Sequence, residues 1–211
     1  MKKILLTGAT GYIGKRMISV ITAQGYKVVC CCRDKNRFSK PSGIDSSLID
    51  VIEIDFLKPE TLKNIPEDIS GAYYLMHSMS NTEDYEDVEK ECARNFVSEI
   101  AKTQCEHIIY LSGLVNQTEL SKHLNSRYQV EQILMESQIA TTVLRAGIII
   151  GSGSASFEII RDLVEKLPVM VTPKWLDTKC QPIGIANVLD FLIFTLFKKE
   201  AYHKSFDIGC D

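Results

Sequence analysis

The chain has 211 residues, of which 45% are hydrophobic and 24% are charged, and its formal net charge is −3. These values are typical of a soluble globular protein, and the length suffices for one domain with a complete core. The slightly negative charge gives no electrostatic reason to expect nucleic acid or an anionic membrane surface as a partner. The first apolar run, Ile4–Leu6, is too short for a secretion signal, so we interpret residues 3–7 as a first β-strand.

Strand-like and helix-like segments alternate along the rest of the chain. Strands are expected at 27–32, 51–55, 71–76, 107–111 and 141–150, and helices at 12–24, 59–65, 85–103, 122–137 and 157–167. Strands that are continuously apolar, each followed by a helix, favour a parallel sheet covered on both faces. We therefore predict the α/β class: a doubly wound, Rossmann-like parallel sheet in three layers, α/β/α. Residues 1–211 would form one domain, in which 151–211 supply a small substrate-side region.

Seven cysteines are present, and three of them are consecutive at 30–32. No C-x-x-C pair occurs, so the sequence supports neither a metal site nor thioredoxin-like chemistry. The three consecutive cysteines lie in a predicted strand, where a thiol behaves as a small hydrophobic group. Free buried thiols predict a reducing, cytoplasmic location.

Residues 183–197 form the most apolar segment of the chain. This segment is too short to cross a bilayer and contains Asn187 and Asp190, so no membrane span is predicted. On a helix its apolar residues would go almost all the way round, which predicts that more than one face is covered. A second copy of the chain in a homo-oligomer, or a further C-terminal domain, would provide such a cover.

Three glycines follow the first strand in the stretch TGATGYIG. Gly8 permits a tight turn, Gly11 lets the backbone approach a diphosphate, and Gly14 lets the following helix pack closely on the strand. The free amides and the positive end of that helix would then face the phosphates. Because a strand precedes the glycines and a helix follows them, the motif predicts a dinucleotide site.

This motif resembles the TGxxGxxG fingerprint of the extended and atypical short-chain dehydrogenase/reductases. The resemblance continues in the expected order from Lys2 to about Gly209, through YLSG, LRAGIIIGSG and QPIGIANVLDFL. It is strongest for the NAD(P)H-binding, NmrA-like subgroup whose members are often labelled nucleoside-sugar epimerases. The resemblance implies a nicotinamide dinucleotide held by residues after the first, third and fourth strands, namely Gly8, Thr10, Gly11, Tyr12, Ile13, Gly14, Asp55, Phe56, Met76, His77 and Ser78.

The end of the second strand predicts which nucleotide binds. A carboxylate there accepts from a ribose 2′-hydroxyl, whereas an arginine favours a 2′-phosphate. The strand ends at Cys32 and is followed by Arg33, with Arg37 close behind. A guanidinium binds phosphate through two parallel hydrogen bonds, so NADP is favoured over NAD. Asp34 leaves NAD open, since a rotation of the turn would present its carboxylate instead.

The family's catalytic pair of Tyr and Lys, four residues apart on one helical face, is absent. The matching helix reads HLNSRYQ, with His123 at the tyrosine position and Arg127 at the lysine position. In one interpretation His123 is a general acid and Arg127 holds the nicotinamide ribose, although a neighbouring cation would disfavour protonated histidine. In the other interpretation the pair is structural or only binds cofactor, and catalysis is weak, located elsewhere or lost.

Strand ends supply two further catalytic candidates. His77 follows the fourth strand and Ser112 follows the fifth, and ligands of open α/β sheets lie at such carboxyl ends. Either side chain would reach a substrate oxygen, and either would equally serve in a turn. The small residues at 151–157 suit a lid over the substrate as well as a plain loop.

These features predict an NADP(H)-binding oxidoreductase or epimerase-like enzyme acting on a small carbonyl or sugar-derived substrate. Hydride would move to or from the nicotinamide, and an acid such as His123 would assist. The missing Tyr and Lys support an alternative, a non-catalytic NADP(H)-binding redox sensor. A structural protein with a vestigial pocket is the third hypothesis, because one fold hosts many functions.

Overall fold

A seven-stranded parallel sheet forms the centre of the molecule in the computed structural model, which describes residues 1–76, 85–115, 121–166 and 181–209. The strand order is β3-β2-β1-β4-β5-β6-β9, so the direction of winding reverses between β1 and β4. The strands are β1 Lys3–Leu6, β2 Lys27–Cys32, β3 Ile49–Glu53, β4 Ile69–Tyr74, β5 His107–Gly113, β6 Ala140–Ala146 and β9 Lys204–Ile208.

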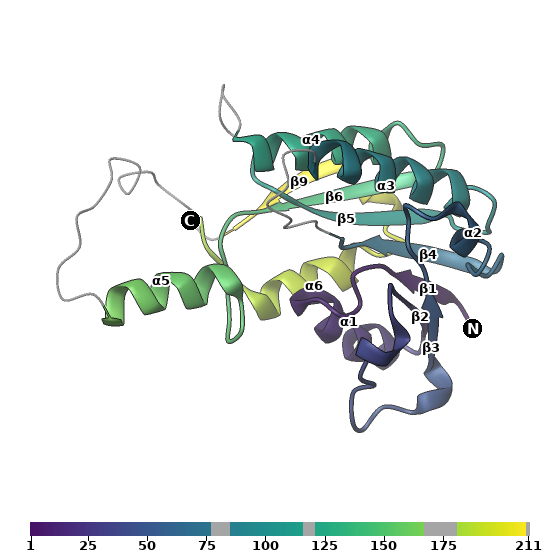
Figure 1. Ribbon diagram of the computed structural model, residues 1–211, viewed down its shortest axis with the longest axis horizontal. Helices are drawn as coiled ribbons and strands as arrows, with labels where there is room; N and C mark the ends of the chain where they lie inside the picture. The colour runs from purple at the N-terminus through teal and green to yellow at the C-terminus, as the bar shows by residue number, and fades with distance from the viewer. Residues whose placement is uncertain (77–84, 116–120, 167–180, 210–211) are drawn as a thin grey trace.

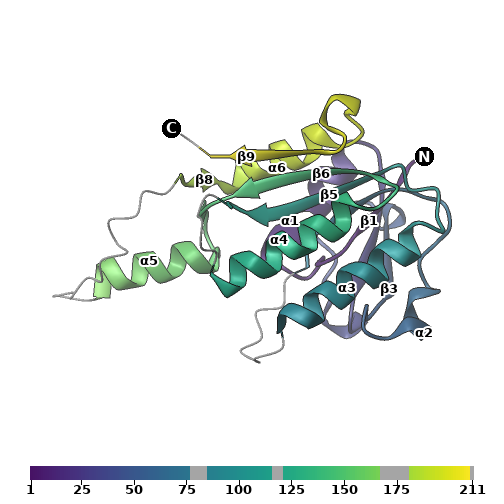
Figure 2. The same cartoon turned by 90° about the horizontal axis from the view of Figure 1, so that it is seen from above.

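Helices cover both faces of this sheet (Figures 1 and 2). The helices are α1 Tyr12–Ala23, α2 Pro59–Leu62, α3 Tyr85–Ile100, α4 Lys122–Met135, α5 Ala155–Lys166 and α6 Ile185–Thr195. The buried side chains of α1 and α6 pack with one set of strand residues, and those of α3 and α4 pack with the other. The predicted three-layer, doubly wound fold is confirmed.

Burial on both faces explains why the strands are continuously apolar. In β1, Ile4 and Leu6 face the α1 layer while Leu5 faces the α3 layer, and all three are fully buried. Cys30 and Cys31 alternate in the same way in β2, so the consecutive cysteines are core residues, as predicted. Burial raises the pKa of the Cys30 thiol to about 12. The three thiols therefore act as apolar packing groups.

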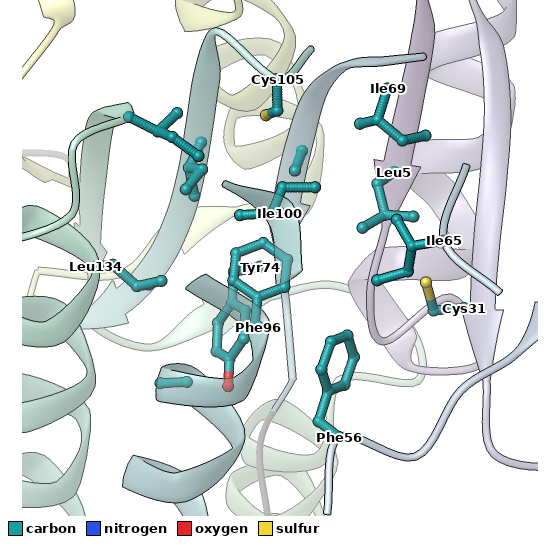
Figure 3. Packing of buried hydrophobic residues seen from close by; sticks show 14 of the residues in the cluster. Leu5, Cys31, Phe56, Ile65, Ile69, Tyr74, Phe96, Ile100, Cys105 and Leu134 are labelled. Atoms are coloured by element: carbon teal, nitrogen blue, oxygen red, sulfur yellow. The ribbon is translucent and has the colours of Figure 1, made fainter. Parts of the chain in front are cut away.

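Aromatic rings join the sheet to α3. The ring of Phe96 lies 4.9 Å from that of Tyr74 and 5.7 Å from that of Phe56, both in edge-to-face orientation. Tyr74 in turn lies 5.8 Å from Tyr110 of β5. Figure 3 shows Tyr74, Phe96 and Phe56 among the buried residues of this layer. Such ring pairs stabilise the fold beyond the effect of the apolar area that they bury, and their geometry fixes the spacing of α3 from β4.

The predicted strand 141–150 is confirmed as far as Ala146, but its predicted end is wrong, because the chain leaves the sheet at Gly147. A Cβ at Gly147 would lie 2.9 Å from the carbonyl oxygen of Gln181. Beyond this close contact, β7 (Ile149–Ile150) pairs with β8 (Ile183–Gly184) in a separate two-stranded sheet. The third and fourth strands also begin and end two residues earlier than predicted, since apolar residues such as Ile54 continue the pattern past the end of each strand.

The sequence analysis missed β9, the outer strand next to β6. Its residues KSFDI alternate poorly, and most of them are partly or fully exposed, as on many edge strands. Glu131 of α4 helps to hold it, since its carboxylate accepts hydrogen bonds from Arg145 Nε at 3.1 Å and from Ser205 Oγ at 3.0 Å.

The apolar segment 183–197 begins with β8 and continues as α6. One face of α6, with Val188 and Leu192, is buried against α1 and the sheet. On another face, Phe191 is 42% exposed and Phe194 is 67% exposed. The expected second covered face is therefore not found within the described part of the chain, and a covering domain or subunit stays a prediction. No described helix combines the length and hydrophobicity that crossing a bilayer requires.

A buried histidine holds the chain between α6 and β9. His107, at the start of β5, is fully buried. Its Nδ1 accepts from the amide of Phe197 at 3.0 Å, and its Nε2 lies 2.9 Å from Thr142 Oγ1, which donates to the carbonyl of Ala201 at 2.7 Å. These partners require the neutral ring, protonated on Nε2 alone. Burial lowers the pKa of His107 to about 4.

We predict that His107 makes folding pH-dependent. The pKa of histidine in the unfolded chain is near 6.5. Between about pH 6.5 and 4 the unfolded chain therefore binds a proton at this residue that the folded chain does not bind. The contribution of His107 to the free energy of unfolding is fully present above pH 6.5. As the pH falls toward 4, that free energy decreases by on the order of 3 kcal/mol. Urea unfolding at pH 7.5, 6 and 4.5 should show this slope in the wild type and most of it in His123→Gln, because the pKa of the partly buried His123 is also lowered. An unchanged slope in His107→Gln would contradict it.

We predict that Gly14→Ala destabilises the fold. A Cβ at Gly14 would lie 2.2 Å from the carbonyl oxygen of Gly8 and 2.9 Å from Ala9 Cα, so α1 would have to move off the β1 turn. The expected loss in the free energy of unfolding is about 2 kcal/mol or more. Gly184→Ala is the matched control, since its Cβ would meet only the end of the Asn187 side chain at 3.1 Å. Equal losses in the two variants would rule out this explanation.

Candidate nucleotide site

A cavity of about 460 Å³ lies along the carboxyl ends of β1, β2, β4 and β5. It spans the point where the strand order reverses, which is where open α/β sheets bind ligands. The wall is formed by Gly8, Thr10, Gly11, Tyr12, Ile13, Gly14, Cys31, Cys32, Arg33, Ile54, Asp55, Phe56, Leu57, Tyr74, Leu75, Met76, Val88, Glu89, Cys92, Tyr110, Leu111 and Val130.

The glycine turn forms the middle of this wall. Gly8 has φ +65°, and a Cβ there would lie 2.4 Å from the carbonyl oxygen of Leu75, so neither its conformation nor its space suits another residue. Gly11 is the N-cap of α1 and has no side chain with which to cap the helix. The first amides of α1 therefore point toward the cavity edge as donors for an anion. Thr7 fixes this geometry, because its hydroxyl donates to Tyr73 O and accepts from Leu75 N.

One end of the cavity lies over β2 and β3. Arg33 and Asp55 are in the wall, with Asp55 Oδ1 accepting from the amide of Leu57 at 3.1 Å. Asp34 Oδ1 accepts from the amide of Asn36 at 2.9 Å and so caps a short 3₁₀ turn, Lys35–Arg37. Arg37 is exposed on that turn and does not line the cavity. The structure thus brings Arg33, but not Arg37, to the cavity, and it shows Asp34 in the turn.

Ser112 lies within β5 rather than after it, which corrects the predicted strand end. Its side chain is 1% exposed and is absent from the cavity wall. The hydroxyl has no hydrogen-bond partner of normal geometry among the described residues. A Cβ on the neighbouring Gly113 would lie 3.5 Å from Arg127 Cδ, so Arg127 packs against the end of β5. A buried hydroxyl without a partner is unusual and suits a site that rearranges around a ligand.

His123 and Arg127 lie on successive turns of α4. His123 is exposed at the beginning of the helix, and its pKa is lowered by partial burial and by the Arg127 cation, as expected for this pair. Burial likewise lowers the pKa of Arg127. Its Nε has no partner among the described residues, and its backbone carbonyl accepts from Tyr110 Oη at 3.3 Å. Neither side chain lines the cavity, although Val130 from the next turn does.

Tyr74, Tyr110 and Glu89 are among the cavity residues that were not predicted as site residues. Tyr74 and Tyr110 lie inside strands and belong both to the core and to the cavity wall. Glu89 of α3 is 7% exposed, lines the cavity and accepts a hydrogen bond from Ser126 of α4. The four-residue repeat of Val88, Cys92 and Phe96 indicated an apolar face and gave no signal that the adjacent glutamate is buried. The predicted residues His77 and Ser78 lie outside the described residues.

The segment after β7 contacts the glycine turn directly. A Cβ at Gly151 would lie 2.4 Å from Tyr12 Oη, so the tyrosine ring needs a glycine there. Arg16 lies 4.0 Å from the Tyr12 ring centroid and donates to the carbonyl of Ser152 at 3.0 Å. Tyr12 Oη is buried without a hydrogen-bond partner among the described residues. The start of the predicted substrate-side region therefore shares a wall with the predicted diphosphate site.

Comparison with known proteins yields a curated relative from Arabidopsis thaliana, the chloroplastic divinyl chlorophyllide a 8-vinyl-reductase. It is 20% identical over 98% of this chain and 52% of its own length. The chain thus spans about half the length of the curated relative that it matches.

Solved structures at 14–17% identity share the fold. The enzyme WbmG of Bordetella bronchiseptica in complex with NAD superposes with a TM-score of 0.78 at 14% identity, covering 98% of this chain and 72% of that chain. The UDP-glucuronic acid 4-epimerase of Bacillus cereus in complex with NAD also has a TM-score of 0.78, at 17% identity, covering 98% and 77%.

The sequence itself assigns the family. The model of the NmrA-like family matches residues 1–167, which include the glycine turn and the whole sheet except β9. The resemblance to the NmrA-like subgroup inferred from TGATGYIG and the later motifs is confirmed, and the solved structures share the Rossmann-type fold. The chain therefore belongs to the NmrA-like family.

Proposed function

We propose that this protein is an NADP(H)-dependent oxidoreductase or epimerase-like enzyme that acts on a small carbonyl or sugar-derived substrate. The observation that carries the proposal is the continuous cavity, which runs from Arg33 and Asp55, past the glycine turn, to Tyr110 and Glu89. A side chain at Gly8 is excluded by a contact of 2.4 Å and Gly11 has none, so at these two positions the backbone borders the predicted diphosphate. A reductase and an epimerase are among the similar proteins, and both classes move hydride.

NADP is our choice of nucleotide because of the end of β2. Arg33 lines the cavity where an adenosine ribose would lie, and a guanidinium suits a 2′-phosphate. The carboxylate of Asp34, which would suit NAD, already caps the turn at Asn36. The two solved neighbours described above contain NAD, so this choice rests on the residues of this chain alone.

The bound cofactor would supply or accept the hydride, and the chain would supply position and a proton. Ser112 lies near the end of β5, where a small rearrangement would let its hydroxyl bind a substrate oxygen. His123 would donate the proton from the beginning of α4. Since the pKa of His123 is lowered, only a minority of it is protonated at neutral pH, and reduction should become faster as the pH falls.

We predict that Arg33→Ala weakens NADPH binding about tenfold or more and leaves NADH binding unchanged, because the lost hydrogen bonds are charge-assisted. Titration calorimetry with both nucleotides measures this. Arg37→Ala is the matched control, since Arg37 carries the same charge on the adjacent turn but is outside the cavity wall. Wild-type affinity for NADH that equals or exceeds that for NADPH would overturn the choice of NADP.

We predict that the wild type oxidises NADPH with at least one member of a panel of quinones, aldehydes and keto-sugars. Ser112→Ala and His123→Gln should lower kcat/KM roughly a hundredfold while NADPH affinity is kept. The wild-type rate should rise between pH 8 and pH 6, and that rise should vanish in His123→Gln. Tyr128→Phe, on the exposed side of α4, is the control. Tight NADPH binding without turnover across the panel would contradict an enzymatic function.

A further inference from the structure

The α3 wall of the cavity contains a buried acid that neither the motifs nor the comparisons assign. Glu89 is 7% exposed, lies on the second turn of α3, and lines the cavity. A carboxylate leaves water at a high cost unless it is hydrogen-bonded, so its position is informative. The hydroxyl of Ser126, fully buried on α4, donates to Glu89 Oε2. That bond fixes the carboxylate against the cavity and ties α3 to α4.

The position of Glu89 in the cavity indicates which part of a ligand it meets. The glycine turn divides the cavity into a side over β2 and β3 and a side over β4 and β5. Arg33 and Asp55 are on the first side, where the adenosine half of the nucleotide belongs. Among the described wall residues on the second side, Glu89 is the one charged side chain, surrounded by groups such as Met76, Tyr110 and Val130.

The chemistry of the carboxylate suits hydroxyl donors. A carboxylate offers about four acceptor positions, so it can accept from more than one donor at once. Recognition of a ribose by an acid is the same chemistry that Rossmann folds use at the end of β2. Arg127 is the neighbouring cation on α4. Burial lowers the pKa of Arg127 and of His123, and the negative charge of Glu89 offsets part of that lowering. An anion is therefore part of the electrostatic balance of this side of the cavity.

We propose that Glu89 binds the ribose hydroxyls of the nicotinamide half of the dinucleotide, with Ser126 holding its carboxylate in place. This inference rests on the proposed function, since it requires that a nicotinamide nucleotide occupies the cavity. In this chain an acceptor on α3 would then perform part of the ribose binding that the absent Tyr and Lys perform on the helix after Ser112 in the family enzymes.

The test compares two ligands that differ by the nicotinamide ribotide, which comprises the nicotinamide, its ribose and one phosphate. Titration calorimetry with NADPH and with adenosine 2′,5′-bisphosphate is run on the wild type, Glu89→Gln and Glu91→Gln. Glu89→Gln should weaken NADPH binding by a factor of about ten, the loss expected for a hydrogen bond to a charged group, and leave the bisphosphate unchanged. Glu91→Gln, which removes an exposed charge two residues away on α3, should change neither affinity.

Other outcomes separate the possible failures. Unchanged NADPH affinity in Glu89→Gln, or an equal loss for both ligands, overturns the role of Glu89 but not the nucleotide site. A wild type that binds neither ligand overturns the proposed function and this inference together. If circular dichroism shows that Glu89→Gln does not fold, the same titrations are run on Ser126→Ala. Loss of the Ser126 hydroxyl removes the bond that holds the Glu89 carboxylate, so it should weaken NADPH binding and leave bisphosphate binding unchanged. Equal NADPH affinity in Ser126→Ala and the wild type would then count against the proposal.

Discussion

The close approach of α1 to the ends of β1 and β4 is the constraint on which the site depends. The carbonyl of Gly8 faces Gly14, and the carbonyl of Leu75 faces Gly8, at distances that leave no room for a Cβ. Thr7 ties the same strand ends together through its hydroxyl. Because the contact is between backbone atoms, the amino end of α1 lies at the floor of the cavity. Its amides and dipole act there at short range.

Several buried polar atoms near the carboxyl edge of the sheet lack a hydrogen-bond partner among the described residues, in contrast to the fully paired His107 at the amino edge. At the amino edge, both nitrogens of the buried His107 have partners, and the turn between α6 and β9 is held through them. At the carboxyl edge, the buried atoms Tyr12 Oη, Ser112 Oγ and Arg127 Nε have no hydrogen-bond partner among the described residues. Buried polar groups without a hydrogen-bond partner lower the stability of the fold. Their presence near the cavity fits a site in which a ligand supplies the missing partners.

Local patterns predicted the fold well, because burial on both faces leaves a strong signal in strands such as β1 and β2. The glycine turn was equally predictable, since its requirement is steric and local. The break after β6 was not predictable, because the contact that makes Gly147 necessary comes from Gln181, far along the chain. Edge strand β9 gives little apolar signal, as a strand with one free edge need not be hydrophobic. The burial of Glu89 depends on Ser126 from another helix, a pairing that no single-helix periodicity reveals.

The contact between Tyr12 and the segment after β7 has a consequence for how this scaffold can diversify. Arg16 binds the main-chain carbonyl of Ser152, and Gly151 makes room for the hydroxyl of Tyr12. Substitutions at position 152 should therefore be tolerated. An insertion or deletion of one residue between β7 and α5 would instead displace the phosphate turn as well. New substrate preferences are expected to arise by substitutions along α5, with the length of this short connection held constant.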